Sequence, residues 1–184
     1  MNFFASDPLA RLLGAWSAAP GPWCAVFRIA LAALLAAVIG WERSSKRHSA
    51  GLRTFMLVCL AGCAAALLDQ ALPGYKLPLL SASAIIGMAI LSCNSILFSS
   101  KNQIKGLTTS TALWACGLLG VALGSGAYVL SLAAFAALLL TVSWFPRLEK
   151  YLKDRSNHFE VHLELKSQEK LQDFVATIRA LGIR

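Results

Sequence analysis

Residues 23–41 read WCAVFRIALAALLAAVIGW, an apolar run with a single charge, at Arg28 near its start. As a helix rising about 1.5 Å per residue, such a run spans most of the ~30 Å apolar layer of a bilayer. Four similar runs follow, with bounds 52–68, 77–98, 107–123 and 127–145. Because no charge lies at the middle of any run, the sequence predicts an all-α membrane protein with five transmembrane helices.

The composition and the placement of charge fit this fold class. Of 184 residues, 57% are hydrophobic and only 14% are charged, which is unusual for a soluble domain. The net charge of +8 does not indicate a nucleic-acid partner, because Lys and Arg cluster in the short segments between apolar runs. These basic segments alternate with nearly neutral ones. The alternation predicts an outer N-terminus and a cytoplasmic C-terminus.

The sequence divides into three parts. Residues 1–22 form an N-terminal segment on the outer side, interpreted as a short interfacial helix. Residues 23–146 form the five-helix domain, and 147–184 form a cytoplasmic linker and a βα tail. In this tail, residues 158–165 alternate in polarity as a half-buried strand does, and a helix follows. The polar strand face carries two His and two Glu, and a solvated face is favoured over a metal site.

All five cysteines fall inside apolar runs without a C-x-x-C motif, so they are interpreted as packing residues. We expect no cofactor, metal site or enzymatic activity, since no nucleophile–base pair is recognisable. Small residues, by contrast, mark close helix contacts. Gly117, Gly120 and Gly124 share one face of the fourth run, and Gly40 joins a row of alanines in the first. Packing within the chain is favoured, and a homo-oligomer stays open.

Charged residues gather around the first connection. Arg28 lies at the entry of the first run, Glu42 and Arg43 lie at its exit, and Arg53 with Thr54 begins the second. These five residues are candidates for a functional network. One interpretation is a set of interfacial anchors with one ion pair. The other is a buried network in which Glu42 pairs with Arg53 and locks the first hairpin. The first interpretation is favoured.

Polar residues also occur in the third and fourth runs. Thr108 and Thr109 open the fourth run, where capping is favoured over anion binding, and Trp114 follows. Asn94 is the one amide inside an apolar run. We expect it to form an interhelical hydrogen bond, with a polar path as the alternative.

Four short motifs that contain these residues occur along the chain in an order typical of one protein family. They are Gly40-Trp41-Glu42-Arg43, Ala50-Gly51-Leu52-Arg53-Thr54, Gly106-Leu107-Thr108-Thr109 with Trp114, and Gly124-Ser125-Gly126-Ala127-Tyr128. This order resembles the MgtC/SapB family of bacterial inner-membrane proteins, over about residues 28–128. The resemblance implies roles for these segments and for Gly87 of the third run. The tail is similar in kind to a small ACT-like domain. The third run departs from the family's glycine-rich pattern, because Ala89, Ile90, Ser92 and Asn94 replace characteristic residues.

The resemblance implies a link to growth in low magnesium and to virulence. We expect a regulator or accessory of other membrane proteins, whose partners are lipid and either another integral membrane protein or a second copy. The alternative is a transporter of magnesium or another ion, with Asn94, Ser92, Thr108 and Thr109 as a polar route. Regulation is favoured because carriers of hard cations need oxygen ligands near the midplane. The carboxylates of Glu42 and Asp69 lie at opposite edges of the apolar runs.

Overall fold

The structure, a computed structural model, describes residues 7–14, 17, 21–46, 50–72, 77–98 and 104–155. Its helices are α1 (Pro8–Leu13), α3 (Pro22–Ser45), α4 (Leu52–Ala71), α5 (Leu79–Cys93), α6 (Leu107–Gly124), α7 (Tyr128–Ser143) and α8 (Phe145–Asp154). The strands are β1 (Leu97–Phe98) and β2 (Ile104–Lys105). The chain forms two compact units, Met1–Arg147 and Leu148–Arg184.

The first unit is helical, as predicted, and each apolar run forms a helix. Four helices are long and apolar enough to cross a membrane: Pro22–Ser45, Leu52–Ala71, Leu107–Gly124 and Tyr128–Asp154. The predicted third span, 77–98, is too long, because α5 covers only 15 residues. Its last turn tightens at Asn94, and β1 then pairs antiparallel with β2.

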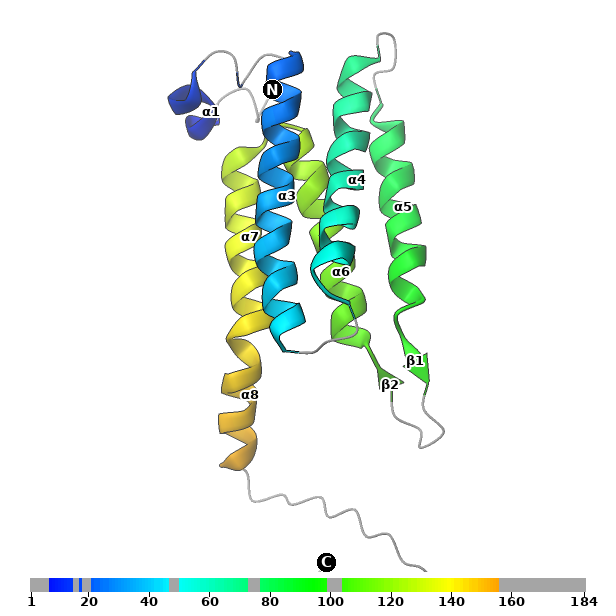
Figure 1. The fold of residues 1–184 in the computed structure, drawn as a ribbon, viewed down its shortest axis with the longest axis vertical. Helices are drawn as coiled ribbons and strands as arrows, with labels where there is room; N and C mark the ends of the chain where they lie inside the picture. Colours follow the sequence, from blue (N-terminus) through cyan, green and yellow to red (C-terminus); the bar gives the residue numbers. More distant parts are fainter. Residues whose placement is uncertain are drawn as a thin grey trace, which may run out of the picture. The chain divides into compact units, whose positions relative to one another are not determined.

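Helix α4 lies at the centre of the first unit. It packs most extensively against α6 and α3, while α5 packs against α4 and α6. Helix α7 contacts α6 and α3 on the other side (Figure 1). The core contains side chains from each of the three central helices: Ala32, Leu35 and Ile39 of α3, Phe55, Cys59 and Cys63 of α4, and Cys116, Leu119 and Leu123 of α6.

The contact between α4 and α6 is a seam of small residues. A Cβ atom on Gly120 would overlap the carbonyl oxygen of Cys59, and one on Gly124 would lie 2.5 Å from that of Cys63. Farther along, Gly62 faces the backbone of Gly117 in the same way. Because lipid gives no hydrophobic drive between helices, this close backbone approach supplies dispersion contacts instead.

The two ends of the chain extend this fold. At the N-terminal end, α1 covers six residues, and the side chain of Asp7 accepts from the N–H of Leu9 at 3.1 Å. At the C-terminal end, the predicted linker begins as helix α8, in which Lys153 pairs with Glu149 at 2.8 Å. The predicted βα tail lies outside the described residues.

Candidate functional site

Helix α3 carries a buried arginine near each of its ends. Arg28 is 3% exposed and Arg43 is 2% exposed, whereas arginines mostly lie on protein surfaces. They are 15 residues apart, which corresponds to about 22 Å along the helix axis. A buried cation is costly unless its donors are satisfied, so the partners of each arginine indicate its role.

Arg28 connects α3 to three other helices. Its Nε donates to the hydroxyl of Tyr128 at 3.1 Å, and its Nη1 donates to Oε1 of Gln70 at 3.1 Å. The same Nη1 donates to the carbonyl oxygen of Gly124 at 2.7 Å, and Nη2 donates to that of Ser17 at 3.2 Å. Since Gln70 lies in α4, Gly124 ends α6 and Tyr128 begins α7, one side chain ties four helices together.

The acceptors around Arg28 are neutral groups. The carbonyl of Gly124 lies at the C-terminus of α6, where the helix dipole favours a cation. The guanidinium carbon also lies 5.8 Å from the centroid of the Tyr128 ring, within the range of a cation–π contact. Within the described ranges no carboxylate bonds to Arg28. Oriented dipoles therefore stabilise this charge.

The turn between α6 and α7 makes room for the guanidinium. Gly126 has a φ of +83°, a conformation that residues with a Cβ rarely adopt. A Cβ at this position would lie 2.7 Å from Nη2 of Arg28. Gly126 therefore allows the left-handed turn and also leaves space for the guanidinium of Arg28.

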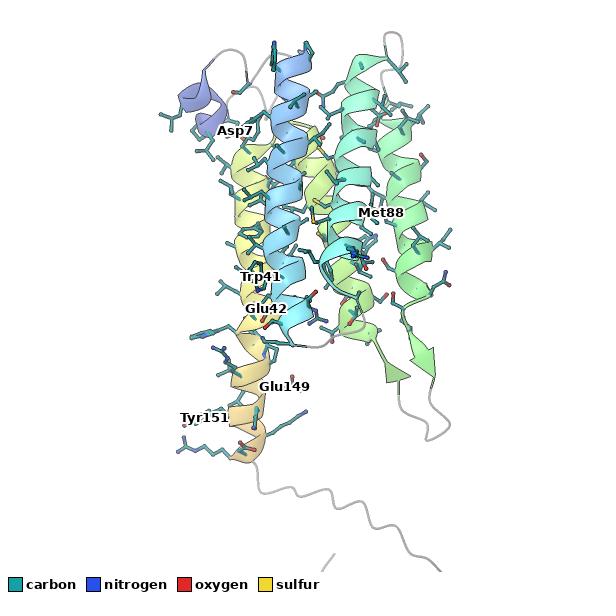
Figure 2. All side chains as sticks on the ribbon, viewed as in Figure 1. Asp7, Trp41, Glu42, Met88, Glu149 and Tyr151 are labelled. Carbon is teal, nitrogen blue, oxygen red and sulfur yellow. The ribbon has the colours of Figure 1, made fainter. Side chains whose placement is uncertain are left out.

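Asp7, Gln70 and Asp69 take part in the structure although sequence reasoning assigned them no site role. Besides capping α1, Asp7 accepts from the backbone N–H of Val129 at 3.0 Å, which ties α1 to α7. Figure 2 labels Asp7 beside the first helix. Asp69 accepts from the N–H of Leu80 at 2.9 Å and of Ser81 at 2.7 Å, so it holds the start of α5. For Asp69 and Gln70, the available signal was a polar residue directly after an apolar run.

Arg43 lies at the other end of α3 and bonds to α6. Its Nη2 donates to Oγ1 of Thr109 at 3.0 Å, and its Nε has no partner among the described residues. The expected capping role of Thr108 and Thr109 is wrong. The N-cap of α6 is Gly106, with a φ of +90° and no side-chain cap. Thr109 instead links two helices, and Thr108 is exposed.

The pairing of Glu42 with Arg53, the less favoured of the two interpretations, does not occur in the structure. Glu42 forms its ion pair with Lys46, one turn farther along α3. Lys46 also donates to the carbonyl oxygen of Ser143 at 3.2 Å and so reaches α7. Arg53 is exposed, and none of the hydrogen bonds or ion pairs of the described residues involves it. Figure 2 shows Glu42 at the end of the bundle where α3 stops.

Other predicted residues lie apart from both arginines. Thr54 and Trp114 are exposed. Asn94 is also exposed and follows α5 as its C-cap, so it does not lie inside a span as expected. Within the described part of the chain, its side chain makes no interhelical hydrogen bond.

The remaining predicted glycines differ in their surroundings. Gly40 lies against the backbone of Leu52, where an added Cβ would be 2.7 Å from the Cα atom. Gly51 lies against the side chain of Ser44, whose Oγ accepts from the N–H of Leu52 at 2.9 Å. These contacts fix the connection between α3 and α4. Gly87, by contrast, has open space where a Cβ would be.

Comparisons with known proteins agree with this architecture. The sequence profile of the MgtC family matches residues 29–151, which include most of the helical unit. Protein SapB of Bacillus subtilis (strain 168) is 26% identical over 171 residues, covering 86% of this chain and 74% of the relative. The putative magnesium transporter YhiD of Escherichia coli (strain K12) is 31% identical over 149 residues, covering 75% and 68%.

Protein MgtC of Brucella abortus (strain 2308) is 32% identical over 113 residues, which cover 61% of this chain and 46% of the relative. No solved structure matches the chain. The family match includes Arg43, Thr109 and Tyr128 and begins one residue after Arg28. With its membrane-spanning helices and these relatives, the chain belongs to the MgtC family.

Proposed function

We propose that this protein is a regulator or accessory of other integral membrane proteins in the bacterial inner membrane. The observation that carries the proposal is the seam between α4 and α6. Its glycines place the two backbones in direct contact, as at Gly120 and Cys59. Such a seam favours a rigid, closed unit over one that opens a path for an ion.

The charged groups support the same function. Arg28 and Arg43 donate hydrogen bonds to other helices of the bundle and so hold these helices together. Glu42 is paired with Lys46, and Asp69 holds the start of α5. Carriers of hard cations need several oxygen ligands near the midplane. Among the described residues, no three His, Cys, Asp or Glu side chains come together as a metal site would require.

The outer face of α5 offers a surface for a partner. Ile86, Ile90 and Leu91 are each 63% exposed, and α5 packs only against α4 and α6 among the major contacts. In a membrane, such a face meets lipid tails or the helix of another protein. An accessory protein needs a face of this kind, and the link to magnesium limitation and virulence comes from the family.

A flux assay separates this proposal from transport. We expect liposomes containing only this protein to take up Mg²⁺ no faster than empty liposomes, with a divalent-cation ionophore as positive control. Flux that depends on the protein and is abolished by Asn94→Leu would establish transport as the primary function. Asn94 is exposed at the end of α5, so this substitution leaves the packed core unchanged.

Photo-crosslinking in native membranes tests the partner directly. A photoreactive phenylalanine analogue at Ile90, on the exposed face of α5, should capture a discrete membrane protein. The same analogue at the buried position Phe55 is the matched control and should give no adduct with another protein. If the analogue at Ile90 and at other exposed positions of α5 formed adducts only with lipid, the proposal that a protein partner binds this face would be wrong.

A further inference from the structure

A groove of about 760 Å³ runs between α3 and α7, toward the end of the bundle where both helices finish. Its walls change in character along its length. Leu34, Ala37 and Leu139 line the part nearer the middle of the helices. Lys46, Ser143 and Arg147 line the part at the helix ends. The groove is therefore amphipathic along the direction in which a lipid lies in a bilayer.

Two tryptophans line the groove toward its polar end. Trp41 of α3 and Trp144, which follows α7, both line it and are both exposed. Figure 2 labels Trp41 just above Glu42 on this side of the bundle. Tryptophan is enriched where the apolar layer meets the headgroups. The apolar part of the groove therefore lies at acyl-chain depth, and its polar end lies at headgroup depth.

The polar end has an available cation. The lining contains Lys46 and Arg147 and one carboxylate, Glu42, so its net charge is +1. Lys46 is bound to Glu42 and to the carbonyl of Ser143. The exposed guanidinium of Arg147 makes no hydrogen bond or ion pair within the described ranges. An arginine fork suits two oxygens of a phosphate, and a lysine beside it adds charge.

We propose that this groove binds one anionic phospholipid. Its phosphate is held by Arg147 with Lys46 beside it, and one acyl chain lies along the apolar wall between α3 and α7. A basic pocket beside membrane-spanning helices is a known mode of binding acidic headgroups. The net positive charge favours a lipid that carries a net negative charge over a zwitterionic one. This site does not depend on the proposed regulatory function.

Two other grooves of the unit lack an exposed cation beside an apolar wall. A groove of about 710 Å³ between α3 and α4 has Arg28 as its charged residue, and the donors of Arg28 are directed at protein acceptors. A smaller groove of about 410 Å³ between α6 and α7 is lined by apolar residues and one threonine. Of these three grooves, the one between α3 and α7 combines an apolar wall with an exposed cation.

Native mass spectrometry of the full chain in detergent tests the proposal. The probes are phosphatidylglycerol and phosphatidylcholine with identical acyl chains. We expect one phosphatidylglycerol to stay bound under conditions that remove phosphatidylcholine. Arg147→Gln should weaken retention about fivefold, the effect of one basic residue near an anionic surface. Arg53→Gln removes an exposed arginine that does not line the groove and should leave retention unchanged.

A second variant tests the apolar wall. Ala37→Trp fills the groove without changing its charge, and we expect it to abolish retention of phosphatidylglycerol. Ala64→Trp makes the matched change in the groove between α3 and α4 and should have no effect. Equal retention of the two lipids, an equal loss in Arg53→Gln, or full competition by glycerol phosphate without acyl chains would each overturn the proposal. Because Arg147 is exposed, Arg147→Gln remains informative even if Ala37→Trp does not fold.

Discussion

At the scale of single residues, Arg28 shows how a membrane protein can direct a buried charge at neutral acceptors. Its partners include a phenol, an amide and two backbone carbonyls, and one of these carbonyls ends a helix. Each of these hydrogen bonds has a charged donor and a neutral acceptor, and all of them converge on one planar group. The side chain therefore acts as a structural joint between helices that are distant in sequence.

Replacing this joint should destabilise the protein strongly. Arg28→Met leaves the hydroxyl of Tyr128 and the carbonyl of Gly124 without their charged donor, so we expect a loss of about 3 kcal/mol in unfolding free energy. Thermal denaturation in detergent would show this loss as a lower melting temperature. Arg53→Met, at an exposed arginine, should melt like the wild type. Equal melting of the Arg28 variant and the wild type would show that the joint is dispensable.

The turn beside Arg28 allows a smaller and more selective change. Gly126→Ala forces a Cβ into a left-handed conformation and toward the guanidinium, which should cost about 1–2 kcal/mol or more. Gly87→Ala adds the same methyl group to open space within α5, where alanine is the better helix former. We expect a lower melting temperature for the first variant and an equal or higher one for the second. The reverse order would contradict this account of Gly126.

Residue-level prediction from the sequence succeeds where a motif constrains a position and fails where a partner is distant. Arg28 was placed in a functional network, but its partners were not identified, since Gln70 and Tyr128 lie far along the chain. The less favoured interpretation, a pair of Glu42 with Arg53, does not form, because Lys46, one turn along the same helix, binds the carboxylate. The i, i+4 spacing of Glu42 and Lys46 on one helix is the local signal that favours this pair over Arg53.

At the scale of elements, the packing of α4 on α6 depends on the absence of side chains at the seam. Gly120→Leu must push α6 away from the backbone of Cys59. Four cysteines are buried and Cys93 is exposed, so the wild type should react with maleimide in detergent at one site. We expect additional labelling at Cys59 and Cys116 in the Gly120 variant.

A control on α5 makes this labelling experiment specific. Gly87→Leu adds the same side chain at a position with open space and should keep the single-site pattern of the wild type. Mass spectrometry of the labelled chain counts the sites. A single labelled site in Gly120→Leu would mean that the two helices do not meet through this glycine.

Within the described residues, all five predicted apolar helices are present, but only four of them are long enough to cross a membrane. Five helices could be found because long apolar runs are unambiguous. The third run was extended to residue 98 because Ile96, Leu97 and Phe98 are apolar. However, β-branched and aromatic side chains suit a strand as well as a helix, and the pairing of β1 with β2 decides the outcome. Hydropathy does not distinguish these two conformations.

At the scale of the whole molecule, the alternation of basic and neutral segments predicts the orientation in the membrane. Arg147, Lys150, Lys153 and Arg155 follow the last apolar run and should keep this part of the chain in the cytoplasm. A green fluorescent protein fused after the last residue should therefore fluoresce, and alkaline phosphatase at the same point should be inactive. Active phosphatase would reverse the predicted topology.

The short helix α5 has a consequence for the surrounding bilayer. Its 15 residues measure about 22 Å, whereas the apolar layer of a membrane is ~30 Å thick. Where its exposed isoleucines meet lipid, a helix this short would require the acyl chains beside it to compress to avoid hydrophobic mismatch. Local thinning costs energy, and it is relieved when another short-span protein shares the deformed patch. Membrane elasticity alone would thus draw neighbours with matching spans to this side of the protein.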